Sequence, residues 1–164
     1  MERSAKKYQL KMVGVRLVRE KTFYSDTPIS QPRHAVQIIQ KFLDNFDKEA
    51  FGIICLSGCG TVNNISIVNI GTANMAITSP REAFKTAILS NATGVILFHN
   101  HPSGNVVPSQ SDRELTCRCC KAGQILDIQV CDHIIVGGGC SDWYSFKAAQ
   151  DPGLISWKDR DGEL

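Results

Sequence analysis

The stretch GVILFHNHPSGNVVPSQSD, residues 94–112, decides most of the fold. Its first five residues form an uninterrupted apolar run, which is typical of a strand buried on both faces of a sheet. Pro102 then interrupts the strand, and a polar loop leads to Ser109, where a helix is predicted to begin. A buried strand followed by a loop and a helix is typical of α/β proteins, which commonly place their sites at the carboxyl ends of strands.

The rest of the chain alternates helices and strands in the same way. Ser79, with Glu82 three residues later, predicts a helix start with a capping box. The expected elements are a strand over 8–20, helices over 33–47, 79–91 and 109–123, strands over 49–57 and 61–71, two strands separated by a short break over 125–139, and a short helix at the end of 141–150. The predicted class is α/β with a mixed sheet and flanking helices.

Length and composition predict one domain. Of the 164 residues, we expect 1–32 to be an N-terminal strand and connector, 33–149 the domain, and 150–164 a charged tail. The net charge of +2 gives weak support for a nucleic-acid partner and none for an anionic membrane. Apolar runs stay below the ~18 residues of a membrane span, and the N-terminus does not resemble a signal peptide. We therefore expect a cytoplasmic protein.

The seven cysteines do not follow the spacing of a disulfide framework. We expect free thiols, as in a reducing compartment. Cys117, Cys119 and Cys120 form the densest group, and we interpret them as small, semi-buried helix residues. A second metal site or redox chemistry at this group is the lesser alternative.

His99 and His101 form the most informative polar pair. Residues two apart on a strand point to the same face, so both imidazoles leave the end of the apolar strand together. Imidazole nitrogens suit zinc, and Asp112, brought back by the loop, is the candidate third ligand. The alternative is equally open at this point: Ser109 and Asp112 also have capping-box spacing, and the histidines would then be solvated.

The pattern His99-Asn100-His101, seven residues, Ser109, two residues, Asp112 resembles the signature of the JAMM (JAB/MPN) metalloproteases. The sequence HNHPSGNVVPSQSD, residues 99–112, resembles the RadC-like branch of this family in particular. Further similarity lies in GT at 71–72, SPREA at 79–83, DHII at 132–135 and YSF at 144–146, so that the resemblance covers about residues 33–149.

The resemblance implies a fold related to cytidine deaminases and one zinc ion per chain, held by His99, His101 and Asp112. It also implies that Glu49 is the general base and that Ser109 stabilises an oxyanion. Taken alone, Glu49 would be a charge at a strand start. The implied activity is that of a zinc metalloprotease, which hydrolyses a peptide or isopeptide amide with water activated by zinc and Glu49.

Other functions remain as alternatives. A zinc deaminase would need H-x-E and P-C-x-x-C motifs, which this sequence lacks. A non-catalytic accessory of DNA repair or mobile elements, binding nucleic acid or protein, is the main alternative, and a metal site without activity is another. Asp132 and His133 are either a buried hydrogen-bonded pair or, for His133, a partner that orients a ligand imidazole. The substrate and the oligomeric state are not predicted.

Overall fold

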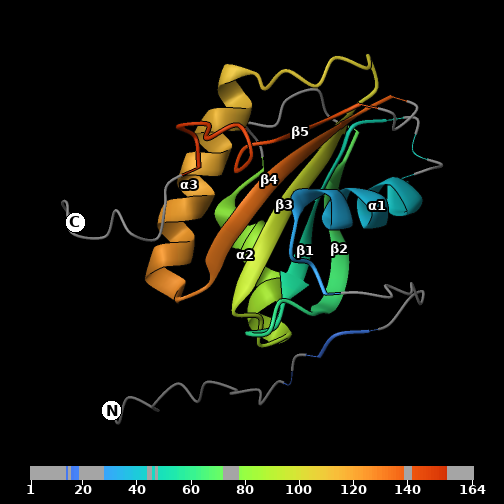
Figure 1. Cartoon of the computed structure of the whole chain (residues 1–164). Helices are drawn as coiled ribbons and strands as arrows, with labels where there is room; N and C mark the ends of the chain where they lie inside the picture. The colour runs from blue at the N-terminus through green and yellow to red at the C-terminus, as the bar shows by residue number, and fades with distance from the viewer. Residues whose placement is uncertain are drawn as a thin grey trace, which may run out of the picture.

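The computed structural model describes residues 14, 16–18, 28–43, 46, 48–71, 78–138 and 142–154. In this part of the chain, helices flank a five-stranded sheet of order β2-β1-β3-β4-β5 (Figure 1). The elements are α1 (Pro32–Leu43), β1 (Ala50–Leu56), β2 (Val62–Ile70), α2 (Pro80–Leu89), β3 (Gly94–His101), α3 (Gln110–Leu126), β4 (Gln129–Gly137) and β5 (Trp143–Ser145). The predicted α/β class with a mixed sheet is confirmed.

The apolar run of the opening stretch is the central strand. β3 is antiparallel to β1 on one side and parallel to β4 on the other, and it is buried along almost its whole length. The outer pairs, β1 with β2 and β4 with β5, are antiparallel. α3 connects the parallel strands β3 and β4, so its N-terminus lies near the carboxyl end of β3.

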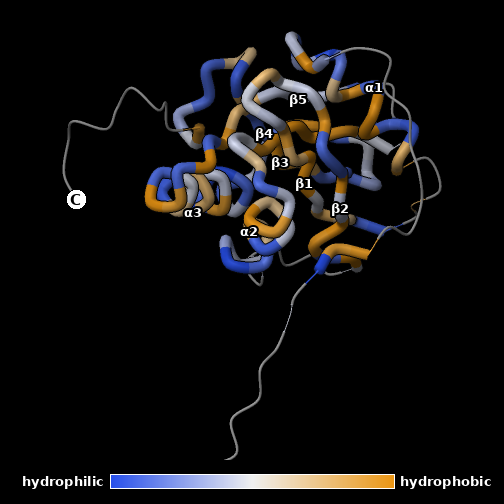
Figure 2. Tube along the Cα trace, turned by 90° about the horizontal axis from the view of Figure 1, so that it is seen from below, coloured by the Kyte–Doolittle hydropathy of each residue, from blue (hydrophilic) through white to orange (hydrophobic). Residues whose placement is uncertain are grey.

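Side chains that alternate along the strands separate into two hydrophobic clusters. Val95 and Leu97 pack with residues of α2 and α3, whereas Ile96 and Phe98 pack with residues of α1. The same division is visible from below, with α2 and α3 on one side of the sheet and α1 on the other (Figure 2). By this alternation, His99 and His101 belong to the α3 face.

The predicted helix ends need two corrections. The expected helix over 33–47 begins at Pro32, a residue suited to a first turn, and ends earlier than expected, at Leu43; Phe46 is not helical. The capping box predicted at Ser79 is wrong: among the described residues, its side chain makes no capping hydrogen bond. The Ser79 carbonyl instead accepts from the Glu82 amide at 3.0 Å, and the Glu82 carboxylate turns to Lys85 at 2.6 Å.

Three further differences lie in the C-terminal half. α3 continues through Gly123 to Leu126, because Gly123 serves packing: a Cβ there would lie 2.4 Å from the carbonyl oxygen of Ile128. The break expected in 125–139 is a bulge within one strand, where Val95 faces Val130 but Ile96 faces Asp132. The short helix expected at the end of 141–150 is wrong, because strand β5 is followed by turns.

Some predictions fall largely outside the described residues. This holds for most of the strand expected over 8–20, whose described residues, 14 and 16–18, are not in a strand, and for the tail beyond Leu154. Thr72 also lies outside them. Within the described ranges, each helix is too short or too polar to cross a membrane.

The cysteine interpretation agrees with the structure where it can be examined. Among the described residues the cysteines form no disulfide, and Cys119 and Cys120 are buried in α3. Burial raises the pKa of Cys119 to about 12, so this thiol stays protonated near neutral pH. The only group among the described residues whose geometry suits a metal ion lies elsewhere, and it does not include these cysteines.

Candidate metal centre

Four of the predicted site residues converge at the carboxyl end of β3. His99 and His101 project from β3 itself. Because β1 is antiparallel to β3 and pairs Phe51 with His99, Glu49, just before β1, lies beside the same strand end. Asp112 arrives from the first turn of α3. Residues from three elements are thereby brought together.

The distances between the candidate ligand atoms of these side chains suit the coordination of one metal ion. The two histidine Nε2 atoms lie 2.9 Å apart, and the Asp112 oxygens lie 3.5 Å from His99 Nε2 and 3.8 Å from His101 Nε2. A carboxylate oxygen of Glu49 and the two imidazoles offer ligand atoms within 4.8 Å of one another. Ligand atoms about 2.0–2.1 Å from a tetrahedral zinc ion lie about 3.3 Å apart. The separations of 2.9 to 3.8 Å among His99, His101 and Asp112 therefore suit such an ion.

The hydrogen bond of His101 defines which nitrogen faces the centre. Its Nδ1 lies 2.5 Å from the carbonyl oxygen of Asn105, which can only accept. Nδ1 therefore carries the hydrogen in the neutral ring, and Nε2 directs a lone pair toward His99 and Asp112.

His99 is fully buried, and its Nδ1 atom, which faces away from the centre, has His133 as its partner. This role of His133 was one of the two alternatives that the sequence left open. His99 Nδ1 lies 2.9 Å from His133 Nε2, on the neighbouring strand β4. Burial lowers the pKa of both rings below the ordinary histidine value, so both are neutral near pH 7. The two alternatives for Asp132 and His133 are both present: the buried Asp132 carboxylate accepts from the His133 amide at 2.7 Å, as well as from Ser145 Oγ and the Lys147 amide, while the His133 ring faces His99.

Asp112 and Ser109 form the capping box and face the histidines at the same time. Ser109 is the N-cap of α3 and accepts from the Asp112 amide, while Asp112 Oδ2 accepts from the Ser109 amide at 2.7 Å. The Ser109 hydroxyl also lies 2.6 Å from Oδ2. Asp112 is only 1% exposed. The two readings of this motif are therefore compatible.

Glu49 is held mainly through its neighbours. The Asn100 side chain donates to the carbonyl of Lys48 at 3.0 Å and accepts from the amide of Ala50 at 2.8 Å, so it clamps the backbone on both sides of Glu49. Partial burial raises the pKa of the Glu49 carboxyl, His101 opposes this and Asp112 adds to it. This clamp was not predicted from the sequence, although a polar residue between two candidate ligands is a signal that could have suggested it.

The loop between β3 and α3 is held against β4 and the C-terminal segment. Gly104 has a positive φ of 82°, which favours glycine. A Cβ on Gly138 would lie 2.6 Å from the carbonyl oxygen of Pro102, so the loop backbone and the segment after β4 approach each other closely. Arg113 donates to the Pro108 carbonyl at 2.8 Å and pairs with Asp151 at 3.0 Å. These contacts hold the loop end from which Ser109 and Asp112 follow.

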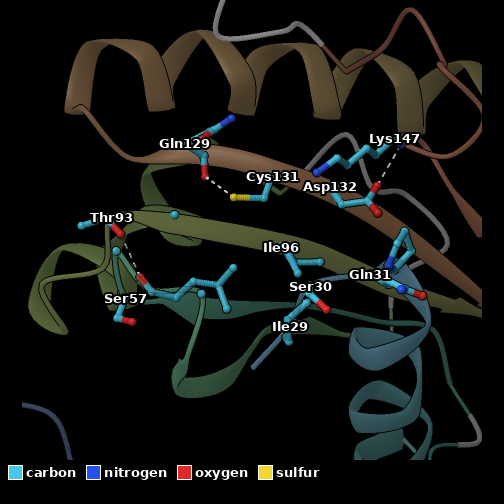
Figure 3. Close-up of a pocket in the computed structure, with 15 residues that line it drawn as sticks. Ile29, Ser30, Gln31, Ser57, Thr93, Ile96, Gln129, Cys131, Asp132 and Lys147 are labelled. Carbon is cyan, nitrogen blue, oxygen red and sulfur yellow. Dashed lines mark hydrogen bonds between the residues drawn. The ribbon is translucent and has the colours of Figure 1, made fainter. Parts of the chain in front are cut away.

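A cavity of about 250 Å³ lies away from this centre, beside α1 and near the amino end of β3 (Figure 3). Its polar lining includes Ser57, Thr93 and Gln129; the Thr93 hydroxyl donates to the Leu56 carbonyl at 3.4 Å, and the Gln129 carbonyl accepts from the Cys131 thiol at 3.7 Å. Asp132 also lines it, but its carboxylate oxygens already have partners. The cavity lacks the histidines and paired carboxylates of the centre, so we place the chemistry at the other end of β3.

Taken together, the fold and the centre define an α/β protein with a candidate metal site of two histidines and two carboxylates. A family model described as a RadC-like JAB domain matches residues 29–151. The chain belongs to this family, and the resemblance carried by the histidine, serine and aspartate spacing is confirmed.

Named relatives agree with this assignment. A UPF0758 protein of Rubrobacter xylanophilus is 41% identical over 111 residues, which cover 68% of this chain and 49% of the relative. A UPF0758 protein of Clostridium acetobutylicum is 35% identical over 138 residues, 83% of this chain and 60% of the relative. The chain thus spans about half the length of the curated relatives it matches, and their names state no activity.

Proposed function

We propose that the protein is a zinc-dependent hydrolase of the JAMM type that cleaves a peptide or isopeptide amide. The observation that carries the proposal is the convergence of two imidazole Nε2 atoms, 2.9 Å apart, with the Asp112 carboxylate. Two lone pairs directed at one point repel each other unless a hydrogen or a cation lies between them. Membership of the JAB family makes the cation the better explanation.

In this proposal His99, His101 and Asp112 hold one zinc ion. Nitrogen and carboxylate oxygen are ordinary zinc ligands, and three protein ligands leave a position open, as in catalytic zinc sites. When bound, zinc supplies a Lewis acid that makes water nucleophilic near neutral pH.

Glu49 would accept the proton of the attacking water and return it to the leaving amine. A catalytic acid–base group works best when its pKa lies near the working pH, and burial shifts the pKa of Glu49 upward. Its side chain is half-buried, which leaves it room to move between proton donor and acceptor.

Ser109 would donate a hydrogen bond to the developing oxyanion, an interaction worth about 3 kcal/mol in the transition state. Its hydroxyl lies 2.6 Å from Asp112 Oδ2, so it would have to turn toward the substrate. Asp112 Oδ2 would then keep its bond from the Ser109 amide at 2.7 Å.

Metal content tests the site. We expect about one zinc per chain in the purified protein by elemental analysis, and loss of that zinc in the H99A/D112A double variant. Zinc retained in the double variant would reject the assigned ligands. Salt-dependent binding of duplex DNA that survives H101A would favour the non-catalytic accessory instead.

Turnover of a fluorogenic peptide and isopeptide library tests the activity. E49Q should keep zinc and lose cleavage, because the amide cannot accept the proton. E114Q is the matched control, since Glu114 is exposed on α3 and pairs with Gln110. Unchanged cleavage by E49Q would reject Glu49 as the base, and loss of zinc would make it a ligand.

A further inference from the structure

His133 and Thr116 are polar residues without exposed surface, and the proposed mechanism does not use them. The His133 ring stacks on Phe146, with centroids 4.8 Å apart, and meets Phe51 edge-on at 6.0 Å. A polar ring in such apolar surroundings is stable only when its nitrogens have hydrogen-bond partners. The partners are His99 on one side and Thr116 on the other.

The hydrogen bonds form a row from His99 through His133 and Thr116 to the Asp112 carbonyl, and the position of each hydrogen in this row follows from that carbonyl. Thr116 Oγ1 lies 2.5 Å from the carbonyl oxygen of Asp112, which can only accept, so the hydroxyl donates its single hydrogen there. Thr116 Oγ1, 2.6 Å from His133 Nδ1, must then accept from that nitrogen. A neutral His133 therefore has a lone pair on Nε2, and His99 Nδ1 donates to it at 2.9 Å.

We propose that His133 and Thr116 are positioning residues that set the tautomer of His99. They keep its hydrogen on Nδ1, so that Nε2 offers its lone pair to the centre. Because this row of hydrogen bonds ends on the main-chain carbonyl of Asp112, it also joins two candidate ligands from different elements, His99 on β3 and Asp112 on α3. The number of protons stays the same, and only their placement matters. The inference rests on the proposed function where it concerns zinc.

The substitution T116V removes the acceptor while keeping the shape of the side chain. The hydrogen of His133 then loses its partner at Nδ1 and is expected on Nε2, which would donate to His99 Nδ1. The hydrogen of His99 would move to Nε2, where it blocks metal binding. Partners of metal-binding histidines typically change metal affinity 10–100-fold, so we expect a loss of about 10–100-fold in zinc affinity.

Two measurements test this. Nitrogen-15 imidazole spectra of the metal-free protein report the tautomer directly, and competition with a chromophoric chelator reports zinc affinity. T116S should restore both, because serine keeps the hydroxyl. T86V is the matched control, since Thr86 on α2 donates to Ser66 away from the centre. H133F, which keeps an aromatic ring against Phe146, should weaken zinc binding as T116V does.

The outcomes separate this inference from the proposed function. If the wild type does not bind zinc, the proposed function fails, while the spectra still decide the tautomer. Wild-type affinity with an unchanged His99 tautomer in T116V would overturn the inference alone. So would a T116S variant that behaves like T116V, because the hydroxyl would then not be the reason.

Discussion

The two carboxylates of the centre are held in opposite ways. Asp112 is almost fully buried, and its Oδ2 accepts from both the amide and the hydroxyl of Ser109. Glu49 is half-buried, and the structure restrains its backbone through Asn100. The α3 side of the centre is thus fixed at the side chain, and the β1 side is fixed at the main chain.

This difference matches two chemical tasks. A metal ligand benefits from an oxygen held in one place, because ordering it in advance lowers the cost of binding. A proton carrier has to reach both the attacking water and the leaving group, so it benefits from a movable side chain on a fixed backbone. The comparison therefore supports the assignment of Asp112 as ligand and Glu49 as base, and it can be broken by substitutions on either side.

The largest effect is expected from D112N. Asparagine keeps an oxygen that can accept from the Ser109 amide, but it loses the charge that attracts a cation. We expect zinc affinity to fall at least about 100-fold, beyond the loss typical of a ligand's partner. Unfolding of the metal-free protein in urea should change by less than about 1 kcal/mol. Unchanged zinc affinity would make Asp112 only a helix cap.

On the β1 side, N100A removes both bonds of the clamp around Glu49. It leaves the Lys48 carbonyl and the Ala50 amide without their side-chain partner, which should cost about 2 kcal/mol in urea unfolding. Zinc should stay bound, because His99 and Asp112 are held from α3 and β4, while turnover of the peptide library should fall. N63A is the control, since Asn63 makes a single surface bond to Ser90. Loss of zinc in N100A would contradict the division into two sides.

How much of the centre can be predicted from sequence depends on how far apart its residues lie in the sequence. His99, His101, Ser109 and Asp112 lie within one strand, loop and helix, so alternation and spacing predict that their side chains converge, and the structure brings them together. The partnership of His99 with His133 depends on the bulge that opposes Ile96 to Asp132. A slip of one residue would turn His133 to the other face. Alternation within a single strand cannot reveal such a register.

The helix starts show the same limit on a smaller scale. Both Ser79 and Ser109 have capping-box spacing, and only the second box forms within the described residues. Glu82 has Lys85 one turn later and pairs with it, whereas Asp112 is enclosed by the histidines and cannot turn away. Local sequence predicts that a helix begins, but the surrounding structure decides which side chain caps it.

The clamp between α3 and the C-terminal segment gives a pH-dependent prediction. Partial burial raises the pKa of Asp151, but bonds from the Gly153 amide, Tyr144 and Arg113, with the charge of Arg113, bring it below the ordinary value. Its stabilisation is therefore complete above the unfolded pKa, about 3.9, and disappears as the pH falls through the lower folded value. D151N should cost about 1.5 kcal/mol in urea unfolding at pH 7 and less at pH 3. An equal difference at both pH values would contradict the assignment.

The smallest expected effects compare the two helix caps. S109A removes the hydroxyl that accepts from the Asp112 amide at 3.2 Å, and loss of such a cap costs about 1 kcal/mol. S79A, at a serine whose backbone carbonyl already accepts from the Glu82 amide, should cost less than about 0.5 kcal/mol. Urea unfolding of the two metal-free variants measures both. Equal costs would mean that the Ser109 hydroxyl does not stabilise the α3 side. A larger cost for S109A, with zinc affinity unchanged, would show that the Ser109 amide alone is enough to keep Asp112 in place.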